Sequence, residues 1–232
     1  ISRGLVGSEM CIRDRYNMLI GICGLIGSGK GTVADILVRD FKFKKISFAD
    51  KLKDTVAHLF DWDRAMLEGD TKESRDWREA EDAFWTKETG KSINPRLVLQ
   101  LFGTDCMRKG FDENIWVSFV KKEILANPTV NYIVPDVRFP NEIDAIKELG
   151  GHMWQVRRGQ LPLWWATAIN VNENWKYVSS HHSMKAVFPE VHESEWRWAS
   201  EDSNFDNIIS NDSTMESLEL KVEELVNNSF LD

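Results

Sequence analysis

A glycine-rich stretch with a single lysine carries the clearest chemical signal in the sequence. Residues 24–32 read GLIGSGKGT and lie between the apolar run MLIGIC at 18–23 and a helical pattern at 30–41. In such a loop, backbone N–H groups converge on phosphate oxygens, the helix N-terminus adds a partial positive charge, and Lys30 neutralises a phosphoryl group. The spacing predicts a nucleotide-phosphate site; the alternative is a tight strand-to-helix turn without a ligand.

The residue that follows Lys30 departs from the commonest phosphate-loop pattern. Gly31 stands where a Ser or Thr usually contacts Mg²⁺, and Thr32 comes one position later. We therefore expect Thr32 to approach Mg²⁺ through water. The pattern GxxGxGKGT resembles the nucleoside monophosphate kinases, in which Mg²⁺ is held largely by waters and by the nucleotide. This resemblance favours phosphoryl transfer over hydrolysis.

An acid and a base follow another apolar run, YIVP at 132–135. Asp136 and Arg138 come next, with Val137 at the position where a motor-type ATPase would carry a Glu that activates water. In open α/β folds, ligands bind at the carboxyl ends of the strands. We expect Asp136 to orient Mg²⁺-bound water or a sugar hydroxyl of the acceptor. A surface salt bridge at the strand end is the simpler alternative.

Strand patterns recur along the chain and alternate with helical ones. Apolar runs predict five strands, at 18–23, around Ile46 and Phe48, and at 132–134, 153–156 and 207–210. Strands joined by helices pair in parallel, with helices on both faces of the sheet. The predicted fold class is therefore α/β, with a doubly wound five-stranded parallel sheet and helices on both faces. The resemblance to the nucleoside monophosphate kinases implies that this fold is a P-loop kinase with an inserted lid.

Capping residues mark where the intervening helices begin and end. Asn94 and Pro95 predict the start of a helix that Gly103 closes, and Asn127-Pro128 ends the next helix. Further helices are expected at 30–41, around 52–60, at 140–149 and after a capping box formed by Ser213 and Glu216. The polar, acidic stretch at 61–91 is typical of surface helices and loops.

Several short motifs occur in a fixed order along the chain. They are ADKLKD (49–54), RLVLQLFGTD (96–105), FD and WV (111–112, 116–117), VPDVR with Glu142 (134–138), HESE (192–195) and ND (211–212). Together they resemble the bacteriophage deoxynucleoside monophosphate kinases over most of the chain from Met18 onward. The similarity is patchy at 61–91 and 160–190.

This resemblance implies two sets of contacts. ATP is expected at Gly27, Ser28, Gly29, Lys30, Gly31, Thr32 and Asn211, and the monophosphate acceptor at Lys53, Arg96, Gln100, Gly103, Trp116, Asp136, Arg138 and Glu142. The planar fork of an arginine fits a phosphate dianion, and Gln100 shares the helical face of Arg96. The alternatives are a surface charge for Arg96, a solvated lysine for Lys53 and a core role for Trp116.

Two arginines, Arg157 and Arg158, open a segment that reaches to about residue 200. In kinases of this kind the corresponding segment is a lid, and we expect at least one of the pair to close over the phosphates. Two solvated charges at a strand end are the alternative. The segment is rich in tryptophan, and we expect these rings to pack within the lid: Trp164, Trp165, Trp175, Trp196 and Trp198.

The composition limits the classes of protein that fit. A net charge of -8 disfavours a sequence-independent grip on nucleic acid, and a mean hydropathy of -0.37 without an apolar run of about 20 residues disfavours a membrane protein. Three cysteines cannot all pair, so we expect a reducing, cytoplasmic compartment, which is the host cytoplasm if the protein is viral. His181, His182 and His192 lack accompanying cysteines and predict no zinc site.

Three subdivisions of the chain are expected. Residues 1–17 show no clear period and are expected to be a non-native or disordered leader, so that the kinase domain covers 18–232. Within it, an acceptor-binding helical region is expected at about 50–127 and the lid at about 157–200.

The phosphate loop together with this resemblance predicts an ATP- and Mg²⁺-dependent (deoxy)nucleoside monophosphate kinase that acts on small nucleotides, with no nucleic-acid or membrane partner. A homodimer is left open. Another small-molecule P-loop kinase, such as a dephospho-coenzyme A kinase, is the nearest alternative. A non-catalytic, nucleotide-binding regulatory protein is the alternative from another class.

Overall fold

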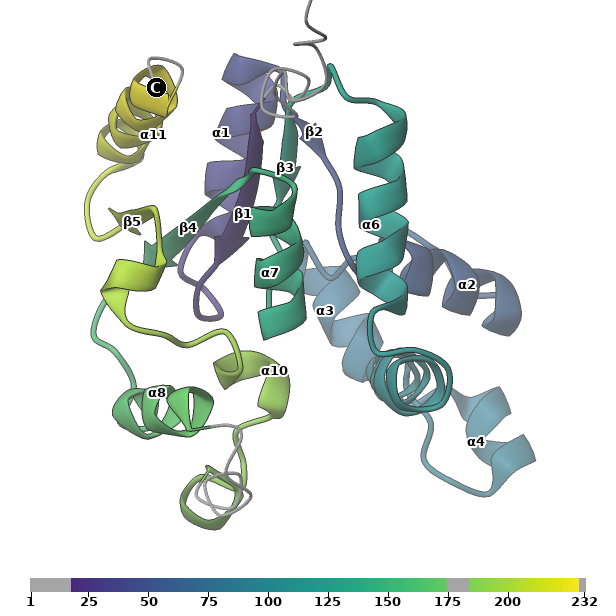
Figure 1. Cartoon of the computed structure of the whole chain (residues 1–232). Coiled ribbons are helices and arrows are strands. Elements are labelled where there is room, and N and C mark those ends of the chain that lie inside the picture. The colour runs from purple at the N-terminus through teal and green to yellow at the C-terminus, as the bar shows by residue number, and fades with distance from the viewer. Residues whose placement is uncertain (1–17, 175–183, 230–232) are drawn as a thin grey trace, which may run out of the picture. The chain divides into compact units, whose positions relative to one another are not determined.

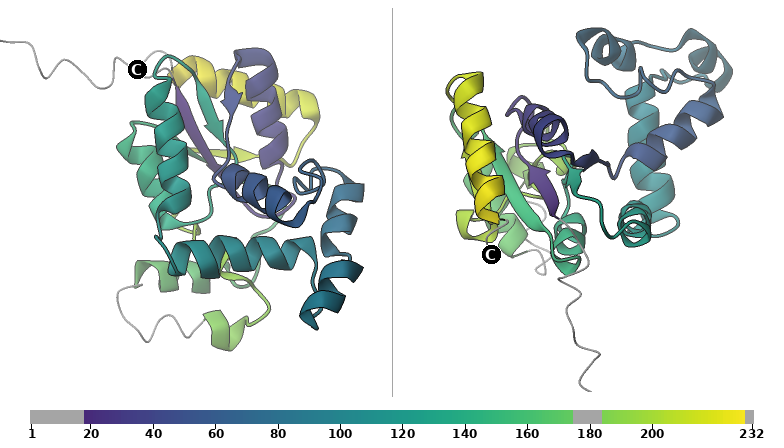
Figure 2. Two further views of the ribbon diagram at one scale, coloured as in Figure 1. Left: turned by 90° about the vertical axis from the view of Figure 1, so that its right-hand side faces the viewer. Right: turned by 90° about the horizontal axis from the view of Figure 1, so that it is seen from above.

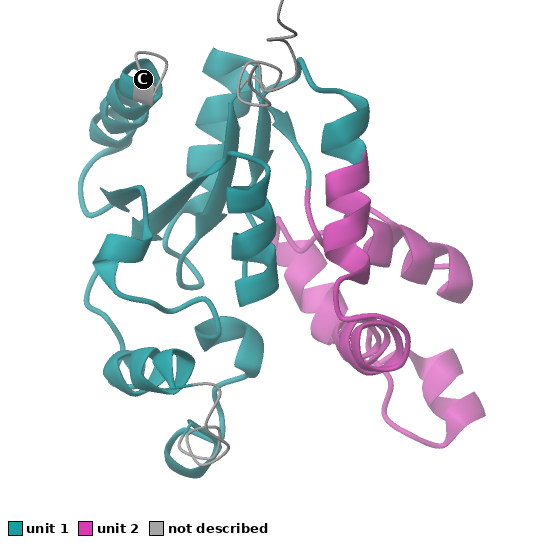
Figure 3. Ribbon diagram, viewed as in Figure 1, with its two compact units in different colours: residues 1–46, 123–232 teal, residues 47–122 magenta. Residues whose placement is uncertain are grey.

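Two compact units make up the chain (Figure 3). The first comprises residues 1–46 and 123–232, and the second comprises residues 47–122. The computed structural model describes residues 18–174 and 184–229. The predicted leader at 1–17 lies outside the described residues.

The first unit is built on a parallel sheet of five strands in the order β2-β3-β1-β4-β5 (Figure 1). The central strand β1 pairs with β3 through Gly21 and Val134, and with β4 through Gly21 and Met153. This confirms the predicted α/β class and the parallel pairing. The strands are β1 (Leu19–Cys23), β2 (Lys44–Lys45), β3 (Tyr132–Val134), β4 (His152–Arg157) and β5 (Asn207–Ser210).

Helices cover both faces of this sheet, as Figures 1 and 2 show. Alternate residues of β1 point to opposite faces. Ile20 and Ile22 are fully buried in a core that also holds side chains of α1 and α11, whereas a Cβ on Gly21 would meet Ile146 of α7. The three helices are α1 (Lys30–Phe41), α7 (Pro140–Glu148) and α11 (Met215–Ser229).

The segment between β4 and β5 is held together by aromatic packing. It contains α8 (Trp165–Glu173), α10 (Glu193–Trp196) and a short 3₁₀ helix (Asp202–Asn204). Trp165, Trp196 and Trp198 are buried, and the rings of Trp165 and Trp198 meet edge to face at 5.2 Å. The prediction that these rings pack within the segment is confirmed for them, while Trp175, His181 and His182 lie outside the described residues.

Helices alone form the second unit in the described chain. Its core joins Val56, Leu67 and Val98 with the rings of Phe60, Trp62 and Trp77. Part of the polar stretch at 61–91 therefore packs inward. The helices are α2 (Asp50–Phe60), α3 (Lys72–Glu79), α4 (Ala83–Thr89), α5 (Pro95–Gln100), a π-helix (Leu101–Lys109) and the start of α6 (Ile115–Ala126).

Gly103 does not close a helix, contrary to the sequence prediction. Asn94 and Pro95 do begin α5, but the chain continues through Gly103 as a π-helix. Gly103 is buried, and a Cβ there would lie 2.7 Å from the side chain of Leu52 on α2. The glycine therefore permits close helix packing instead of a left-handed helix end.

Two other boundaries differ from the predictions. The second strand is Lys44–Lys45 and not the apolar pair Ile46 and Phe48. These two side chains are buried, but the chain turns after Ile46, where the Ser47 N–H donates to Asp50 Oδ2. At α11 the side chain of Thr214, not Ser213, accepts from the Ser217 N–H at 3.3 Å.

Candidate active site

The phosphate loop joins β1 to α1 and is held in shape by contacts across the first unit. Gly29 has a φ of 101°, and a Cβ there would lie 2.2 Å from the amide nitrogen of Asn211. Asn211, just after β5, donates its amide N–H to the carbonyl of Ser28 at 2.9 Å. A residue at position 29 must therefore have positive φ and no side chain, which is why glycine is required.

Lys30 lies in this loop with neutral partners. Its ammonium donates to the carbonyls of Gly24 at 2.7 Å and Leu25 at 2.8 Å. Burial, and next the positive charge of Arg138, lower the pKa of Lys30 to about 8, against the smaller opposing effects of Glu195, Cys23 and Asp136. A buried ammonium whose partners are carbonyls keeps its net charge available for an anion.

A pocket of about 540 Å³ opens above this loop within the first unit. Its size is in the range of small-ligand sites. The structure brings predicted ATP residues from the loop and from the end of β5 together with Arg158. The lining residues are Gly27, Gly29, Lys30, Gly31, Thr32, Arg158, Asn211, Ser213, Met215 and Leu218.

The two consecutive arginines at the end of β4 have different surroundings. Arg157 donates to Gln155 Oε1 at 2.8 Å and pairs with Asp202 at 3.2 Å, so its guanidinium is held by the protein. Arg158 is exposed and lines the phosphate-loop pocket. Of the pair, Arg158 therefore has the placement expected of a phosphate-binding side chain.

The turn after β3 and the start of α7 carry three of the predicted acceptor residues, and these differ in role. Glu142 is buried, and its carboxylate accepts from the backbone N–H groups of Arg138 at 2.7 Å and Phe139 at 3.1 Å. It thus caps α7 and fixes the turn after the strand. Asp136 is half-buried, while the Arg138 guanidinium is exposed and pairs with Glu195 at 3.3 Å.

In the second unit, most of the predicted acceptor residues already have protein partners. Lys53, only 14% exposed, donates to Glu68 Oε2 at 2.5 Å, and Arg96 pairs with Glu79 at 2.6 Å. Trp116 is buried and donates its Nε1–H to the carbonyl of Gly103 at 3.0 Å. The surroundings of Trp116 are therefore those of a core residue, the alternative named for it in the sequence analysis. Gln100 is exposed one turn after Arg96.

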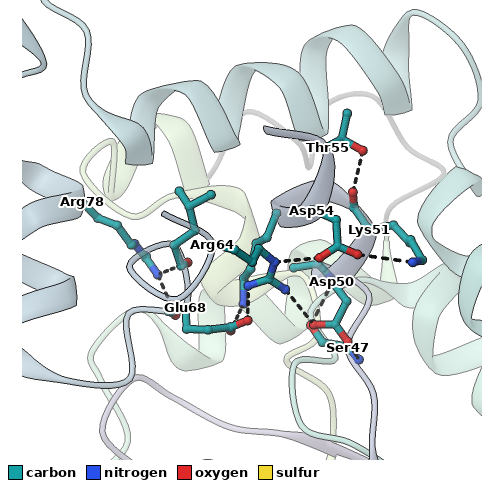
Figure 4. A network of polar contacts seen from close by, with 11 residues as sticks. Ser47, Asp50, Lys51, Asp54, Thr55, Arg64, Glu68 and Arg78 are labelled. Carbon is teal, nitrogen blue, oxygen red and sulfur yellow. Dashed lines mark hydrogen bonds and ion pairs between the residues drawn. The ribbon is translucent and has the colours of Figure 1, made fainter. Parts of the chain in front are cut away.

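A network around Arg64 was not singled out in the sequence. Arg64 pairs with Asp54 at 2.7 Å, with Asp50 at 3.6 Å and with Glu68 (Figure 4). The second carboxylate oxygen of Glu68 accepts a hydrogen bond from Lys53. The only signals for it are two four-residue spacings, Asp50–Asp54 and Arg64–Glu68, which place each pair on one helical face or turn. Such spacings are common, so they do not identify a network.

The acidic residues near the loop fit a loosely held Mg²⁺. Within residues 18–174 and 184–229, no three His, Cys, Asp or Glu side chains gather as metal ligands. Thr32 faces the pocket, and Asp136 is close enough to Lys30 to act on its pKa. One hydroxyl and one carboxylate suit a cation that keeps most of its waters and binds phosphate oxygens, as Mg²⁺ does.

The side chain of His192 takes part in a local turn, where its ring nitrogen accepts a hydrogen bond from the Ser194 N–H. In the described chain no helix is long and apolar enough to cross a membrane.

Comparison with solved structures finds kinases at low similarity. Shikimate kinase from Aquifex aeolicus aligns with a TM-score of 0.42 and 14% identity, covering 92% of this chain and 99% of that one. Shikimate kinase from Acinetobacter baumannii aligns with a TM-score of 0.42 and 13% identity, covering 96% and 100%. The assignment of the fold rests on the sheet order and helix placement described above.

Comparison with sequences is more specific. The family model for deoxynucleotide monophosphate kinase matches residues 65–161. The deoxynucleoside-5′-monophosphate kinase of Escherichia phage T5 is 38% identical over 56 residues, covering 24% of this chain and 22% of that protein. A predicted deoxynucleotide monophosphate kinase of Acanthamoeba polyphaga mimivirus is 34% identical over 152 residues, covering 61% of this chain and 74% of that protein. On this evidence, the chain belongs to the deoxynucleotide monophosphate kinase family.

Proposed function

We propose that the protein transfers the γ-phosphoryl group of ATP to a deoxynucleoside monophosphate, giving ADP and a deoxynucleoside diphosphate. The observation that carries this proposal is the phosphate loop, where Lys30 lines the 540 Å³ pocket and donates to two neutral backbone carbonyls. Membership of the deoxynucleotide monophosphate kinase family supports the choice of acceptor.

Transfer needs positioning and charge stabilisation more than covalent chemistry. An oxygen of the acceptor's 5′-phosphate attacks the γ-phosphorus, and the bond from that phosphorus to the bridging oxygen of ADP breaks. Loop N–H groups and Lys30 bind the ATP phosphates, while Arg158 stabilises charge on the transferring group. Asn211 acts indirectly, because its hydrogen bond to the Ser28 carbonyl holds the loop.

Two arginines, Arg138 and Arg96, are assigned to the acceptor phosphate. Arg138, at the end of β3, offers an exposed guanidinium, and Arg96 on α5 offers a second. Lys53 and Gln100 are assigned to the acceptor as well. Gly103 and Trp116 support this region by packing and by their mutual hydrogen bond, and Glu142 supports Arg138 through its backbone.

Mg²⁺ would be held by Thr32 and Asp136 through water, together with the phosphates of ATP. When bound, it neutralises charge on those phosphates. Gly27, Gly29 and Gly31 let the backbone approach the same phosphates closely.

The direct test is coupled ADP release from Mg-ATP with dAMP, dGMP, dCMP, dTMP and dephospho-coenzyme A offered separately. We expect release with at least one deoxynucleotide, and loss of that release in Lys30→Ala and Arg138→Ala. Release only with dephospho-coenzyme A would move the assignment to that acceptor. ATP binding without release for any acceptor would support the non-catalytic alternative.

A further inference from the structure

The HESE element at 192–195 has no part in the function proposed so far, yet it contacts a residue that does. Its last residue, Glu195, lies on α10, and its Oε1 is 3.3 Å from Nη1 of Arg138 (α10 and α7 are labelled in Figure 1). Arg138 and Glu195 are 57 residues apart in sequence and belong to the same unit. The contact therefore depends on how the segment between β4 and β5 folds back toward the end of β3.

Local hydrogen bonds define the turn that carries Glu195. The Ser194 N–H donates to His192 Nδ1 at 3.2 Å, and the Glu195 N–H donates to the His192 carbonyl at 2.9 Å. His192 is thus the N-cap of α10. A side-chain acceptor at this position satisfies an N–H that would otherwise lack a partner and fixes the direction of the first turn.

The residues after Glu195 anchor this turn in the core of the segment. Trp196 is 4% exposed and Trp198 is 3% exposed. The amide of Asn172, on α8, donates to the carbonyls of Trp196 at 3.0 Å and Ala199 at 2.7 Å. Glu195 therefore stands on a packed base, and its own side chain is 22% exposed.

Unlike Glu195, Arg138 has an exposed side chain. Its side chain is 46% exposed, and an unrestrained arginine loses rotamer freedom when it is fixed on a ligand. The Glu195 contact involves Nη1, which leaves the Nε and Nη2 donors for a bidentate phosphate contact. Both charges act on Lys30, Arg138 by lowering its pKa and Glu195 by raising it, so the pair lies within electrostatic range of the phosphate loop.

We propose that Glu195 is a positioning residue that holds the Arg138 guanidinium in the orientation that binds the acceptor phosphate, with His192 setting the turn. The inference rests on the proposed function, since it assigns a role within that reaction. Its physical basis is that a side chain fixed before binding loses less freedom when the phosphate arrives.

The same helix offers a matched control. Glu193 is 50% exposed and pairs with Arg197 four residues on, at 3.4 Å. Glu195→Gln and Glu193→Gln remove one negative charge each from α10, and only the first removes it from Arg138. We expect Glu195→Gln to lower kcat/KM for the preferred deoxynucleotide about 10-fold, the order of a single lost positioning contact. In Glu195→Gln, KM for ATP should change less than about twofold. In Glu193→Gln, both kcat/KM for the deoxynucleotide and KM for ATP should change less than about twofold.

A double-variant experiment separates positioning from a structural role. In an Arg138→Ala background, Glu195→Gln should cause no further loss of kcat/KM, because its effect passes through the arginine. The melting temperatures of the single variants Glu195→Gln and Glu193→Gln should be equal.

Equal effects of Glu195→Gln and Glu193→Gln would overturn the inference. So would a gain in kcat/KM in Glu195→Gln, or a loss that persists without Arg138. If the wild-type protein releases no ADP with any deoxynucleotide, the proposed function itself fails, and this inference fails with it. An active wild type with an unaffected Glu195→Gln variant overturns only the role of Glu195.

Discussion

Lys30 in the first unit and Lys53 in the second are held in opposite ways. Lys30 donates to two backbone carbonyls, which are neutral, whereas Lys53 donates to the carboxylate of Glu68. Two arginines of the second unit, Arg64 and Arg96, are held in the same way as Lys53, whereas Arg75 and Arg78 donate to backbone carbonyls. Arg64 pairs with carboxylates of α2 and with Glu68, and Arg96 pairs with Glu79.

The difference separates binding from stabilisation. Carbonyl partners orient an ammonium without cancelling its charge, and burial then makes that charge costly, so the pKa of Lys30 falls to about 8. An anionic ligand relieves this cost. Carboxylate partners cancel the charge and link parts of the fold, so a phosphate that binds Lys53 or Arg96 must share them with Glu68 or Glu79. We therefore expect the first unit to contribute most to phosphate affinity.

The largest expected effect comes from removing the charge held by carbonyls. Lys30→Ala should lower deoxynucleotide-dependent ADP release by about 10²- to 10³-fold, the scale of one lost electrostatic donor. Its melting temperature should stay close to that of the wild type, because no carboxylate loses a partner. Lys45→Ala, at an exposed lysine of β2, is the control. A strong loss of stability in Lys30→Ala would break the comparison.

The shape of the loop gives the next largest effect. Gly29→Ala places a Cβ at positive φ and 2.2 Å from the Asn211 amide, and it should lower the free energy of unfolding by about 1–3 kcal/mol. Gly31→Ala meets no atom within 4 Å and should change it by less than about 0.5 kcal/mol. Urea denaturation of both variants measures the difference. Equal destabilisation would show that the Asn211 contact does not constrain the loop.

A smaller effect is expected where the second unit ties its π-helix to α6. Trp116→Phe keeps the ring buried but removes the N–H that Gly103 O accepts at 3.0 Å. The free energy of unfolding should fall by about 1 kcal/mol, the typical contribution of one buried hydrogen bond. Denaturant unfolding followed by circular dichroism would show this loss, and Trp77→Phe, in the same core, controls for removal of an indole. If Trp116→Phe lowers the free energy of unfolding no more than Trp77→Phe does, the hydrogen bond from Trp116 to Gly103 does not support this region.

The smallest effect concerns the ion pairs of the second unit. Burial raises the pKa of Glu68, but hydrogen bonds and charges from Lys53 and Arg64 outweigh it, so the net shift is downward. A folded-state pKa below the unfolded value of about 4.3 gives stability that is present above that pH and lost as the pH falls through the folded pKa. Glu68→Gln should cost up to about 1 kcal/mol at pH 7, since the pair is partly exposed.

Measuring the same unfolding free energies at acid pH tests whether the charge of Glu68 is the cause. The gap in unfolding free energy between wild type and Glu68→Gln should shrink as the pH falls below about 4.3, where the wild-type carboxylate begins to lose its contribution. Asp76→Asn, in an exposed pair with Lys72 on α3, is the matched control and should change stability by less than about 0.5 kcal/mol. A gap that stays constant with pH would show that the Glu68 charge is not involved.

The sequence by itself determined the features that depend on near neighbours. Helix α1 begins and ends where the glycine loop and the apolar spacing predict, and Asn94 with Pro95 begins α5 as expected. These features follow from hydrogen bonds and contacts between residues three or four positions apart, so the chain's own order specifies them. Gly103 shows the limit of such reasoning, because a helix-ending glycine and a close-packing glycine look alike in sequence.

Only the tertiary structure decided which partner each long polar side chain has. Asn211 bonds to Ser28 183 residues away, Arg157 is held by Asp202 while Arg158 faces the pocket, and Glu195 reaches Arg138. A strand pattern predicts where a side chain leaves the backbone, but strand order decides what lies beside it. Since an arginine can meet any carboxylate within several ångströms of its end, its role depends on contacts that sequence spacing does not encode.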